Sequence, residues 1–494
     1  MTTLTHLLVF SAAAPLTRLF SPQRARHWLL LVGSVLALYW LQPLTSIRYL
    51  DFWLPTATLA LTLWVWALTR PSAGAPAAPP AKPATAAASA VPVAPIISAR
   101  ADLLTAGVVA GLVLLIGLLR YLGPVCCLTP ARPPALPNVA AALALVVGGA
   151  ALLWRACAGR RLWGLAVVVI LALLVVLKTP ALGLAASAGL RAAGGLDPTL
   201  ASALDLRWLG FSYVAFRLIH VLRDRASGRL PNVSLREFLT YALFFPAYTA
   251  GPIDRLERFV KDDRQPFSLT AAEALAGGER LALGVFKKFV LADSLALVAL
   301  NAANAEQARS TLWLWVLLYA YAWRLYLDFS GYTDIAIGLG RFFGIKLPEN
   351  FDRPYTRQNL TVFWNSWHIT LAQWFRAYVF NPLTRGLRSR PLPPAAIIFI
   401  GQMVIMLLIG LWHGVTWNFI IWGLWHGLGL FVHNRWADFT KPRAALLDGR
   451  PRLKRAAHWL GVVVTFHYVA LGWVWFALPS VGLALGVFAR LFGG

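Results

Sequence analysis

The chain has 494 residues, of which 59% are hydrophobic and only 13% are charged, and it contains 22 tryptophans. Soluble globular proteins carry about 25% charged residues, so this composition excludes a soluble fold, a disordered chain and a collagen-like fibre. It is typical of a polytopic membrane protein whose outer side chains face lipid. The three cysteines (Cys126, Cys127 and Cys157) cannot form a disulfide scaffold or a spaced metal site.

The charge is strongly basic, with 45 Lys and Arg against 20 Asp and Glu, or +25. The basic residues lie in short groups between apolar runs, such as Arg155/Arg160/Arg161, Arg385/Arg388/Arg390 and Arg450/Arg452/Lys454/Arg455. Such groups are typical of cytoplasmic loops that contact anionic headgroups. We therefore expect a multi-pass protein of the cell membrane, with membrane lipid and no nucleic acid among its partners.

Apolar runs of membrane-spanning length follow one another along the chain. Residues 1–20 lack the basic start of a cleaved signal peptide, so we expect an interfacial or first membrane segment there. The clearest later runs lie at 28–44, 51–69, 103–122, 139–154, 162–177, 395–412, 417–432 and 457–478, with less uniform ones at 206–222, 238–250, 281–299, 311–329 and 481–492. They predict an all-α polytopic membrane protein with roughly ten to twelve transmembrane helices plus re-entrant or interfacial ones.

Composition divides the chain into five regions. Of residues 71–95, 18 are Ala or Pro and only Lys82 is charged, which predicts a flexible linker. Near residue 205, polar residues begin to enter the apolar runs, where ionisable groups are costly and indicate function. We therefore expect N-terminal membrane helices at 1–70, a linker at 71–98, an apolar scaffold at 99–204, a functional core at 205–435 and C-terminal membrane helices at 436–494.

Residues 363–378 (FWNSWHITLAQWFRAY) place Trp364, Trp367, His368, Leu371 and Trp374 on one helical face. The spacing predicts one short amphipathic helix with an aromatic stripe. From the residues alone, it fits an interfacial helix in which His368 only forms a hydrogen bond.

His413 lies in the run GLWHG, where one apolar stretch ends and another begins. A neutral imidazole held there could act as a general base near pH 7. A histidine satisfied by a neighbouring carbonyl fits the residues equally well. His426 stands in a second Trp-His-Gly run thirteen residues later, and we interpret it as structural.

Two carboxylates, Asp328 and Asp334, flank Ser330-Gly331. Paired carboxylates suggest acid–base chemistry or cation binding. The favoured interpretation is structural, with Asp334 pairing with Arg324 or Arg341 and Ser-Gly breaking the helix.

Two further segments are interpreted from their residues. The run YTAGPIDR (248–255) indicates a broken helix that lines a cavity. Lys287-Lys288 indicates a positive-inside anchor, or a contact with an acyl carrier or a headgroup. No nucleotide-binding motif is present, so any reaction draws its energy from an activated donor.

Three motifs in order resemble the membrane-bound O-acyltransferase (MBOAT) family. They are LDFSGYTDIAIGLGRFFGIKLPENFDRPY at 327–355, FWNSWHITLAQWFRAYVF at 363–380 and GLWHGVTWNFIIWGLWHG at 410–427. The resemblance covers about residues 205–435. It is to the bacterial branch that includes the membrane proteins of alginate O-acetylation and teichoic-acid D-alanylation.

The resemblance implies a ring of helices with a central funnel. It also implies catalytic roles for His413 and His368, and we take Asn418, Trp412, Trp367, Asp328 and Asp334 as candidate substrate-binding residues. No bound cofactor or metal is expected. The co-substrate would be an acyl thioester, either acetyl-CoA or an acyl-carrier protein, on the cytoplasmic side.

The expected reaction moves an acyl group, foremost acetyl, to a hydroxyl of an extracytoplasmic polysaccharide or to a partner protein. An extracytoplasmic acyltransferase or a carrier protein is the expected partner. Acetyltransferase relatives usually have two arginines at the positions of Asn365-Ser366 and an aspartate at that of Ala377. These departures leave D-alanyl transfer to a cell-envelope polymer as an alternative. A transporter of glycan or lipid is the alternative of another class, but the sequence shows few ion-coupling carboxylates and no repeat.

Overall fold

The computed structural model describes residues 9, 13, 25–70, 98–123, 128–155, 159–442 and 449–494. The predicted linker at 71–98 lies outside the described residues except for Ser98. The three cysteines and nearly all of the segment at 1–20 also lie outside them.

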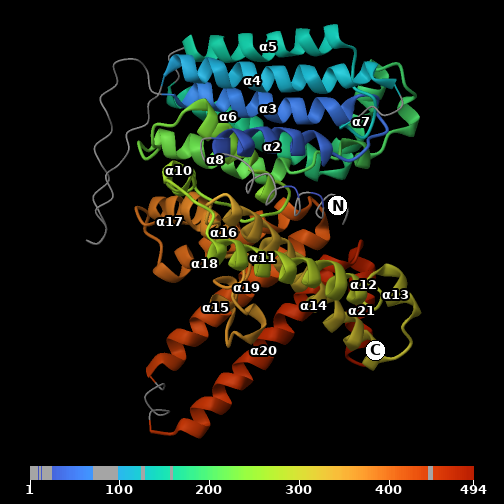
Figure 1. The fold of residues 1–494 in the computed structure, drawn as a ribbon. Helices are drawn as coiled ribbons and strands as arrows, with labels where there is room; N and C mark the ends of the chain where they lie inside the picture. The colour runs from blue at the N-terminus through green and yellow to red at the C-terminus, as the bar shows by residue number, and fades with distance from the viewer. Residues whose placement is uncertain are drawn as a thin grey trace. The chain divides into compact units, whose positions relative to one another are not determined.

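The described chain is helical, and its only β-type pairing is a single bridge between Phe351 and Trp367. It divides into two compact units, Met1–Glu279 with Ala336–Leu347, and Arg280–Ile335 with Pro348–Gly494 (Figure 1). The first unit contains α2 (Arg26–Trp40), α3 (Leu50–Thr69), α4 (Ala99–Leu118), α5 (Leu136–Arg155), α6 (Arg160–Lys178), α7 (Pro180–Ala193), α8 (Phe211–Ala226), α9 (Leu235–Leu243), α10 (Leu256–Arg264) and most of α11 (Ala271–Val285).

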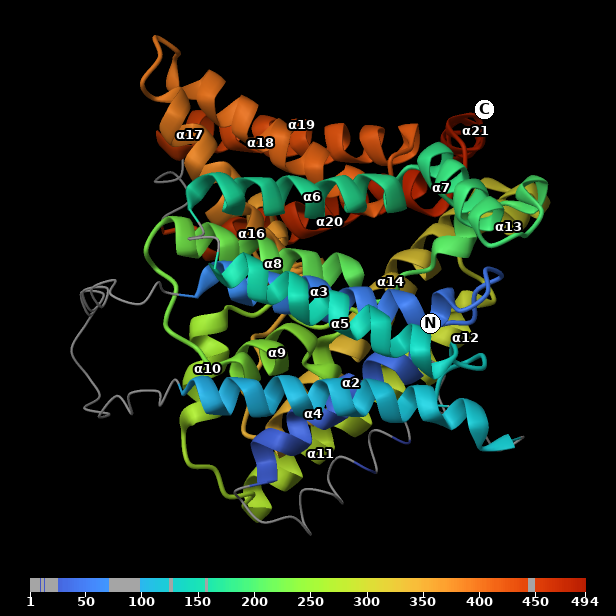
Figure 2. The same cartoon turned by 90° about the horizontal axis from the view of Figure 1, so that it is seen from above.

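The second unit carries the motifs that the sequence singled out. Its helices are α12 (Asp293–Ala296), α13 (Ala302–Gln307), most of α14 (Thr311–Phe342), α15 (Leu360–Trp364), α16 (Ile369–Phe375), α17 (Asn381–Leu387), α18 (Pro394–His413), α19 (Trp417–Thr440), α20 (Pro451–Ala477) and α21 (Val481–Leu491). Two π-helical segments, η7 (Phe286–Ala292) and η9 (Arg376–Phe380), interrupt this set. Helices α18 and α19 pack side by side, and α19 packs on α20 (Figure 2).

The all-α membrane fold predicted from composition is confirmed. Six helices of the described residues (α3, α4 with its short extension, α5, α6, α18 and α20) are long and apolar enough to cross a membrane. Helices α14 and α19 also have the length but carry more polar residues. In the most apolar 18-residue stretch of α3, 72% of the residues are buried within the protein. In the corresponding stretches of α5 and α6, only 11% of the residues are buried. Helix α3 is therefore interior, and α5 and α6 present most of their side chains to lipid.

The broken helix predicted at 248–255 is present between α9 and α10, and Arg217 supports it. The Arg217 side chain is 2% exposed, and its guanidinium donates to the carbonyls of Ala242 and Ala247, each at 2.8 Å. Buried non-helical backbone needs hydrogen-bond partners inside the protein because it is removed from water. Arg217 of α8 supplies those partners, so its placement in an apolar run has a structural cause.

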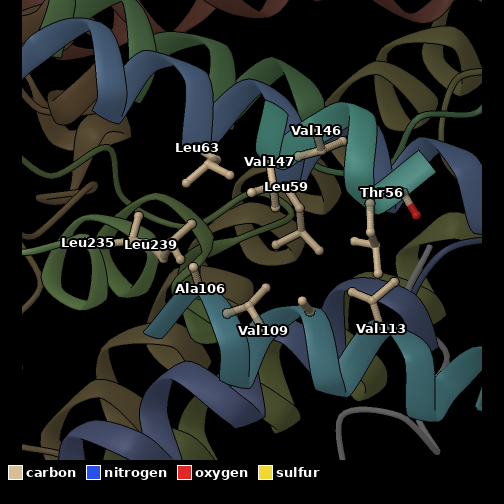
Figure 3. A pocket seen from close by; sticks show the side chains of 12 residues that line it. Thr56, Leu59, Leu63, Ala106, Val109, Val113, Val146, Val147, Leu235 and Leu239 are labelled. Atoms are coloured by element: carbon tan, nitrogen blue, oxygen red, sulfur yellow. The ribbon is translucent and has the colours of Figure 1, made fainter. Parts of the chain in front are cut away.

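An apolar cavity of about 40 Å³ lies among α3, α4, α5 and α9 of the first unit (Figure 3). Leu59, Ala106, Val109, Val113 and Leu239 are among its lining residues, and Thr56 is the one polar residue there. The Thr56 hydroxyl already donates to the Phe52 carbonyl. The cavity is therefore a packing gap with no group that would bind a polar ligand.

Enlarging this gap should destabilise the first unit. We expect Val113→Ala to lower the free energy of unfolding by roughly 1–3 kcal/mol, because the buried methyl groups lose their van der Waals contacts. Val168→Ala on α6 is the matched control, since Val168 is 61% exposed. Thermal unfolding in lipid nanodiscs measures both, and equal shifts for the two variants would contradict the packing of α4 described above.

Candidate active site

His368 sits at a sharp corner between two short helices. Helix α15 ends at Trp364, and α16 begins directly after His368, whose backbone is left-handed (φ 44°, ψ 53°). The single amphipathic helix predicted over 363–378 is therefore wrong. A non-glycine residue adopts this conformation only where its surroundings compensate for the strain.

Asn350 supplies that compensation from the preceding loop. Its side chain is fully buried, and its Oδ1 accepts hydrogen bonds from the backbone N–H of Thr370 (3.2 Å) and from the Thr370 hydroxyl (2.9 Å). Its backbone carbonyl accepts a third bond, from the N–H of Ile369 at 3.0 Å. Asn350 thus satisfies the first amide groups of α16 that a helix start leaves without partners.

The same Oδ1 fixes the protonation of His368. His368 Nδ1 lies 3.1 Å from Asn350 Oδ1, and this oxygen is identified as the acceptor because a backbone N–H also donates to it. Nδ1 must then carry the hydrogen, which leaves Nε2 as an unprotonated acceptor. Nε2 has no hydrogen-bond partner within the part of the chain that the structure describes.

His368 lies inside the protein, with 3% of its surface exposed. Burial lowers its pKa to about 3, so the imidazole is neutral throughout the physiological pH range. The Phe329 ring stands edge-on to it, with centroids 4.6 Å apart, and the Trp412 ring lies on another side at 6.2 Å.

His413 is the last residue of α18 and is only partly buried. Aromatic rings surround its imidazole, with centroid distances of 4.6 Å to Trp412, 4.7 Å to Phe476, 5.6 Å to Trp422 and 5.8 Å to Phe419. Trp412 therefore contacts both candidate histidines. The two imidazoles, which are 45 residues apart in sequence, belong to one aromatic cluster.

Trp367 and Asn418, two of the candidate substrate-binding residues, hold this aromatic cluster in place. The Trp367 ring packs on Trp473, which in turn stacks on Trp422. The Asn418 amide is buried and donates to the carbonyl of Leu478 at 2.8 Å. Asn418 thereby ties the start of α19 to the end of α20, so both helix ends lie beside His413.

Helices α18 and α19 approach each other through glycines of the motif. A methyl group added at Gly410 would collide with the carbonyl oxygen of Phe419, and one at Gly423 would lie 2.6 Å from the carbonyl oxygen of Met406. Small residues let membrane helices come this close. The glycines on either side of His413 therefore fix its position by packing.

The two carboxylates of α14 form ion pairs. Asp328 pairs with Lys288, and Asp334 pairs with Arg280 and with Lys287 at 2.7 Å. The predicted pairing of Asp334 with Arg324 or Arg341 is wrong, because its cations come from α11 and η7. Arg341 is 3.8 Å from Glu273 instead. Lys287 and Lys288 thus connect η7 to α14 through ion pairs. Their interpretation as a positive-inside anchor did not include this role.

The helix break predicted at Ser330-Gly331 is also wrong, because α14 continues through both residues to Phe342. A methyl group at Gly331 would lie 2.9 Å from the carbonyl oxygen of Gly284. Gly331 therefore serves close packing, and this packing brings Lys288 within reach of Asp328. Asp328 also directly precedes Phe329, whose ring contacts His368.

The described residues contain no group of three or more His, Cys, Asp or Glu side chains that could hold a metal ion. The arrangement has two imidazoles in one aromatic cluster, and Nε2 of His368 has no hydrogen-bond partner among the described residues. Such a site can accept a proton from a hydroxyl and orient a planar acyl group.

Comparison with known proteins identifies the family. The model of the membrane-bound O-acyltransferase family (MBOAT) matches residues 157–470. The chain belongs to this family. The match includes both histidines, Asn350 and the ion-paired segment, whereas Trp473, Phe476 and Leu478 at the end of α20 lie just beyond it.

Several curated relatives belong to bacterial cell-envelope systems. The chain is 36% identical to the peptidoglycan O-acetyltransferase of Helicobacter pylori, covering 55% of this chain and 51% of the relative. It is 34% identical to the probable alginate O-acetylase of Azotobacter vinelandii (60% and 56%) and 32% identical to the teichoic acid D-alanyltransferase of Streptococcus thermophilus (57% and 71%). The chain spans about half the length of the first two relatives.

Sequence reasoning missed two residues that organise the site. Asn350 lies in the LPENF run, but nothing local shows that its amide would reach a helix start twenty residues later. Trp422 joins His413 to His426, whose centroid is 4.9 Å from it. Its position in the run WGLWHG was visible, but its contact with His413 depends on how α18 packs on α19.

The glycine packing leads to a stability prediction. We expect Gly423→Ala to destabilise the protein by roughly 1–3 kcal/mol, because the methyl group would push α19 away from α18. Gly486→Ala on α21 is the control, since a methyl group there meets nothing within 4 Å and improves helix propensity. Thermal unfolding in nanodiscs should separate the two, and a stable Gly423→Ala protein would refute the close approach.

The hydrogen bond to Asn350 leads to a spectroscopic prediction. In ¹⁵N-histidine NMR, the resonances of His368, assigned by their loss in His368→Gln, should show a protonated Nδ1 and an unprotonated Nε2. Because burial lowers the pKa to about 3, these shifts should not change between about pH 8 and pH 5. A titration near pH 6.5, or the opposite tautomer, would show that Asn350 does not control this ring.

Proposed function

We propose that the protein is an O-acyltransferase of the cell membrane. It moves an acyl group, foremost acetyl, from a cytoplasmic thioester to a hydroxyl of an extracytoplasmic polysaccharide or to a partner protein. The observation that carries the proposal is the cluster in which Trp412 contacts both His368 and His413. Membership of the family and relatives named as O-acetyltransferases support the reaction class.

His413 is the proposed general base because it is the partly accessible imidazole of the two. The acceptor hydroxyl loses its proton to His413 as its oxygen attacks the thioester carbonyl carbon. The carbon–sulfur bond then breaks, and the proton passes to the departing sulfur. His368 is proposed to accept a hydrogen bond from the acceptor through Nε2. Transfer through an acyl-histidine is the variant that would pass the group to a partner protein.

The charges around the cluster support acetyl over D-alanyl as the transferred group. A D-alanyl group carries an ammonium, which a carboxylate would best stabilise. The four aromatic side chains described around His413 carry no charge. The two carboxylates of α14, Asp328 and Asp334, already pair with cationic side chains. Cation–π contact with the tryptophans is the one alternative for an ammonium. D-alanyl transfer remains the second candidate because some relatives carry that name.

The basic loops support the proposed sidedness. Arg385, Arg388 and Arg390 precede α18, and Arg450, Arg452, Lys454 and Arg455 surround the start of α20. By the positive-inside rule these ends face the cytoplasm. The opposite ends of the same helices carry His413 and the Asn418–Leu478 contact. His413 would then lie toward the side where an exported glycan is available, and the donor would approach from the other.

Transport without chemistry is the candidate of another class. It would need an ion-coupling carboxylate, whereas Asp328 and Asp334 are held in ion pairs. An acyl thioester as co-substrate and an extracytoplasmic acyltransferase or carrier protein as partner complete the proposal. Reconstituted protein that moves glycan but leaves it unacylated would favour transport.

Replacement of His413 tests the assignment directly. We expect purified His413→Ala protein to fold but to transfer acyl groups roughly 10²- to 10⁴-fold more slowly, the contribution typical of a general base. His458→Ala, at an exposed position of α20, should transfer at the wild-type rate. His426→Ala is measured beside them. A selective loss there in folded protein would move the base to His426, and wild-type rates for His413→Ala would remove the assignment.

A further inference from the structure

A basic groove of about 410 Å³ lies between α6 and α8 of the first unit. These two helices pack side by side (Figure 2). The lining residues follow one face of α6 and the end of α8, and they are Arg160, Trp163, Gly164 and Val167 of α6 and Leu222, Arg223 and Ala226 of α8. Ligand pockets in proteins have volumes of roughly 300–1,000 Å³, so the groove has room for a small organic group.

The groove is basic at one end and apolar at the other. Arg160 is the first residue of α6, and Arg223 lies in the last turn of α8. Val167 follows Arg160 by seven residues on α6, or about 10 Å of helix. Beyond the groove, α6 faces lipid, since Val168 is 61% exposed. A molecule with an anionic head and a hydrocarbon tail has the polarity that this groove requires.

Neither arginine of the groove is neutralised within the part of the chain that the structure describes. Arg160 and Arg223 are exposed, and their side chains form no ion pair or hydrogen bond with described residues. Asp224, the residue next to Arg223, pairs with Arg229 at 2.9 Å instead. No carboxylate lines the groove. Its two guanidiniums can therefore both bind an anion such as a phosphate.

Trp163 and Gly164 give the groove its form. The indole N–H of Trp163 donates to the carbonyl of Leu68 at 2.9 Å, which holds the ring at the end of α3. A methyl group added at Gly164 would meet no atom within 4 Å, so the space beside this ring is open. Tryptophan is enriched at the level of the lipid headgroups. The position of Trp163 near the start of α6 fits that level.

Further basic residues indicate which side of the membrane the groove faces. Arg155 and Arg161 lie on either side of the connection between α5 and α6, and Arg225 lies in the last turn of α8. By the positive-inside rule, these helix ends face the cytoplasm. The cytoplasmic leaflet carries the anionic lipids that attract basic segments close to the membrane.

We propose that the groove binds one anionic phospholipid of the cytoplasmic leaflet. Arg160 and Arg223 bind its phosphate, and an acyl chain follows α6 past Val167. Only Ile170 and Leu174 of α6 are buried in the protein. A lipid held by both arginines therefore links this loosely packed helix to the well-buried α8. The inference concerns the scaffold and does not depend on the proposed reaction.

Native mass spectrometry of the full chain in a neutral detergent tests the inference. It measures the affinity of the first bound lipid for phosphatidylglycerol and for phosphatidylcholine with the same acyl chains. We expect phosphatidylglycerol to bind roughly 25-fold more tightly, about fivefold for each arginine at a membrane surface. Arg160→Gln and Arg223→Gln should each remove about fivefold of that preference.

Two further variants separate a defined groove from general surface charge. Arg161→Gln is the matched control, because Arg161 is the exposed neighbour of Arg160, loses the same charge and does not line the groove. It should bind phosphatidylglycerol as the wild type does. Gly164→Leu keeps both arginines but fills the open space, and it should weaken phosphatidylglycerol. Thermal unfolding of each variant shows that it is folded.

Three results would overturn the inference. The first is equal affinity of the wild type for the two lipids. The second is a loss in Arg161→Gln as large as that in Arg160→Gln, or none in folded Gly164→Leu, either of which would indicate diffuse surface charge. The third is binding of glycerol 3-phosphate as tight as that of phosphatidylglycerol, which would make the groove a site for a soluble phosphate.

Discussion

The close approach of α18 and α19 is the constraint on which the site depends. Gly410 and Gly423 bring the two backbones to a separation that excludes even a methyl group. Because no hydrophobic force draws helices together inside a bilayer, such contacts and hydrogen bonds must hold them. The hairpin formed in this way places His413 at its turn and Trp422 beneath it. The aromatic cluster around His413 therefore depends on two glycines, Gly410 and Gly423, whose lack of a side chain lets the helices pack closely.

Buried polar side chains follow a common rule in both units. Arg217 binds backbone carbonyls, Asp334 binds two cations, and Asn350 binds the start of α16. Each makes hydrogen bonds or ion pairs within the protein, as burial away from water requires. Buried polar atoms without a hydrogen-bond partner among the described residues occur in both units, for example Thr240 Oγ1 in the first unit and His368 Nε2 in the second.

The sequence predicted the parts of this structure that depend on local pattern. Hydropathy located the helices, and the resemblance to the acyltransferase family, rather than spacing, pointed to both histidines. The left-handed corner at His368 was not predictable, because the residue that stabilises it, Asn350, is eighteen positions away. Gly331 was misread because a glycine that breaks a helix and one that packs against a neighbour look alike in sequence. The partners of Asp334 could not be known before α11 and η7 were placed beside α14.

The shallow burial of α5 and α6 has a consequence for handling the protein. Since most of their side chains touch lipid, the bilayer is a large part of their packing environment. Detergent extraction would replace those ordered acyl chains with loosely packed micellar ones. The lateral support of α5 and α6 would then weaken while the glycine-packed hairpin, held by protein contacts, would be spared. Inactivation during solubilisation should therefore begin in the scaffold, far along the chain from the histidines whose activity would be measured.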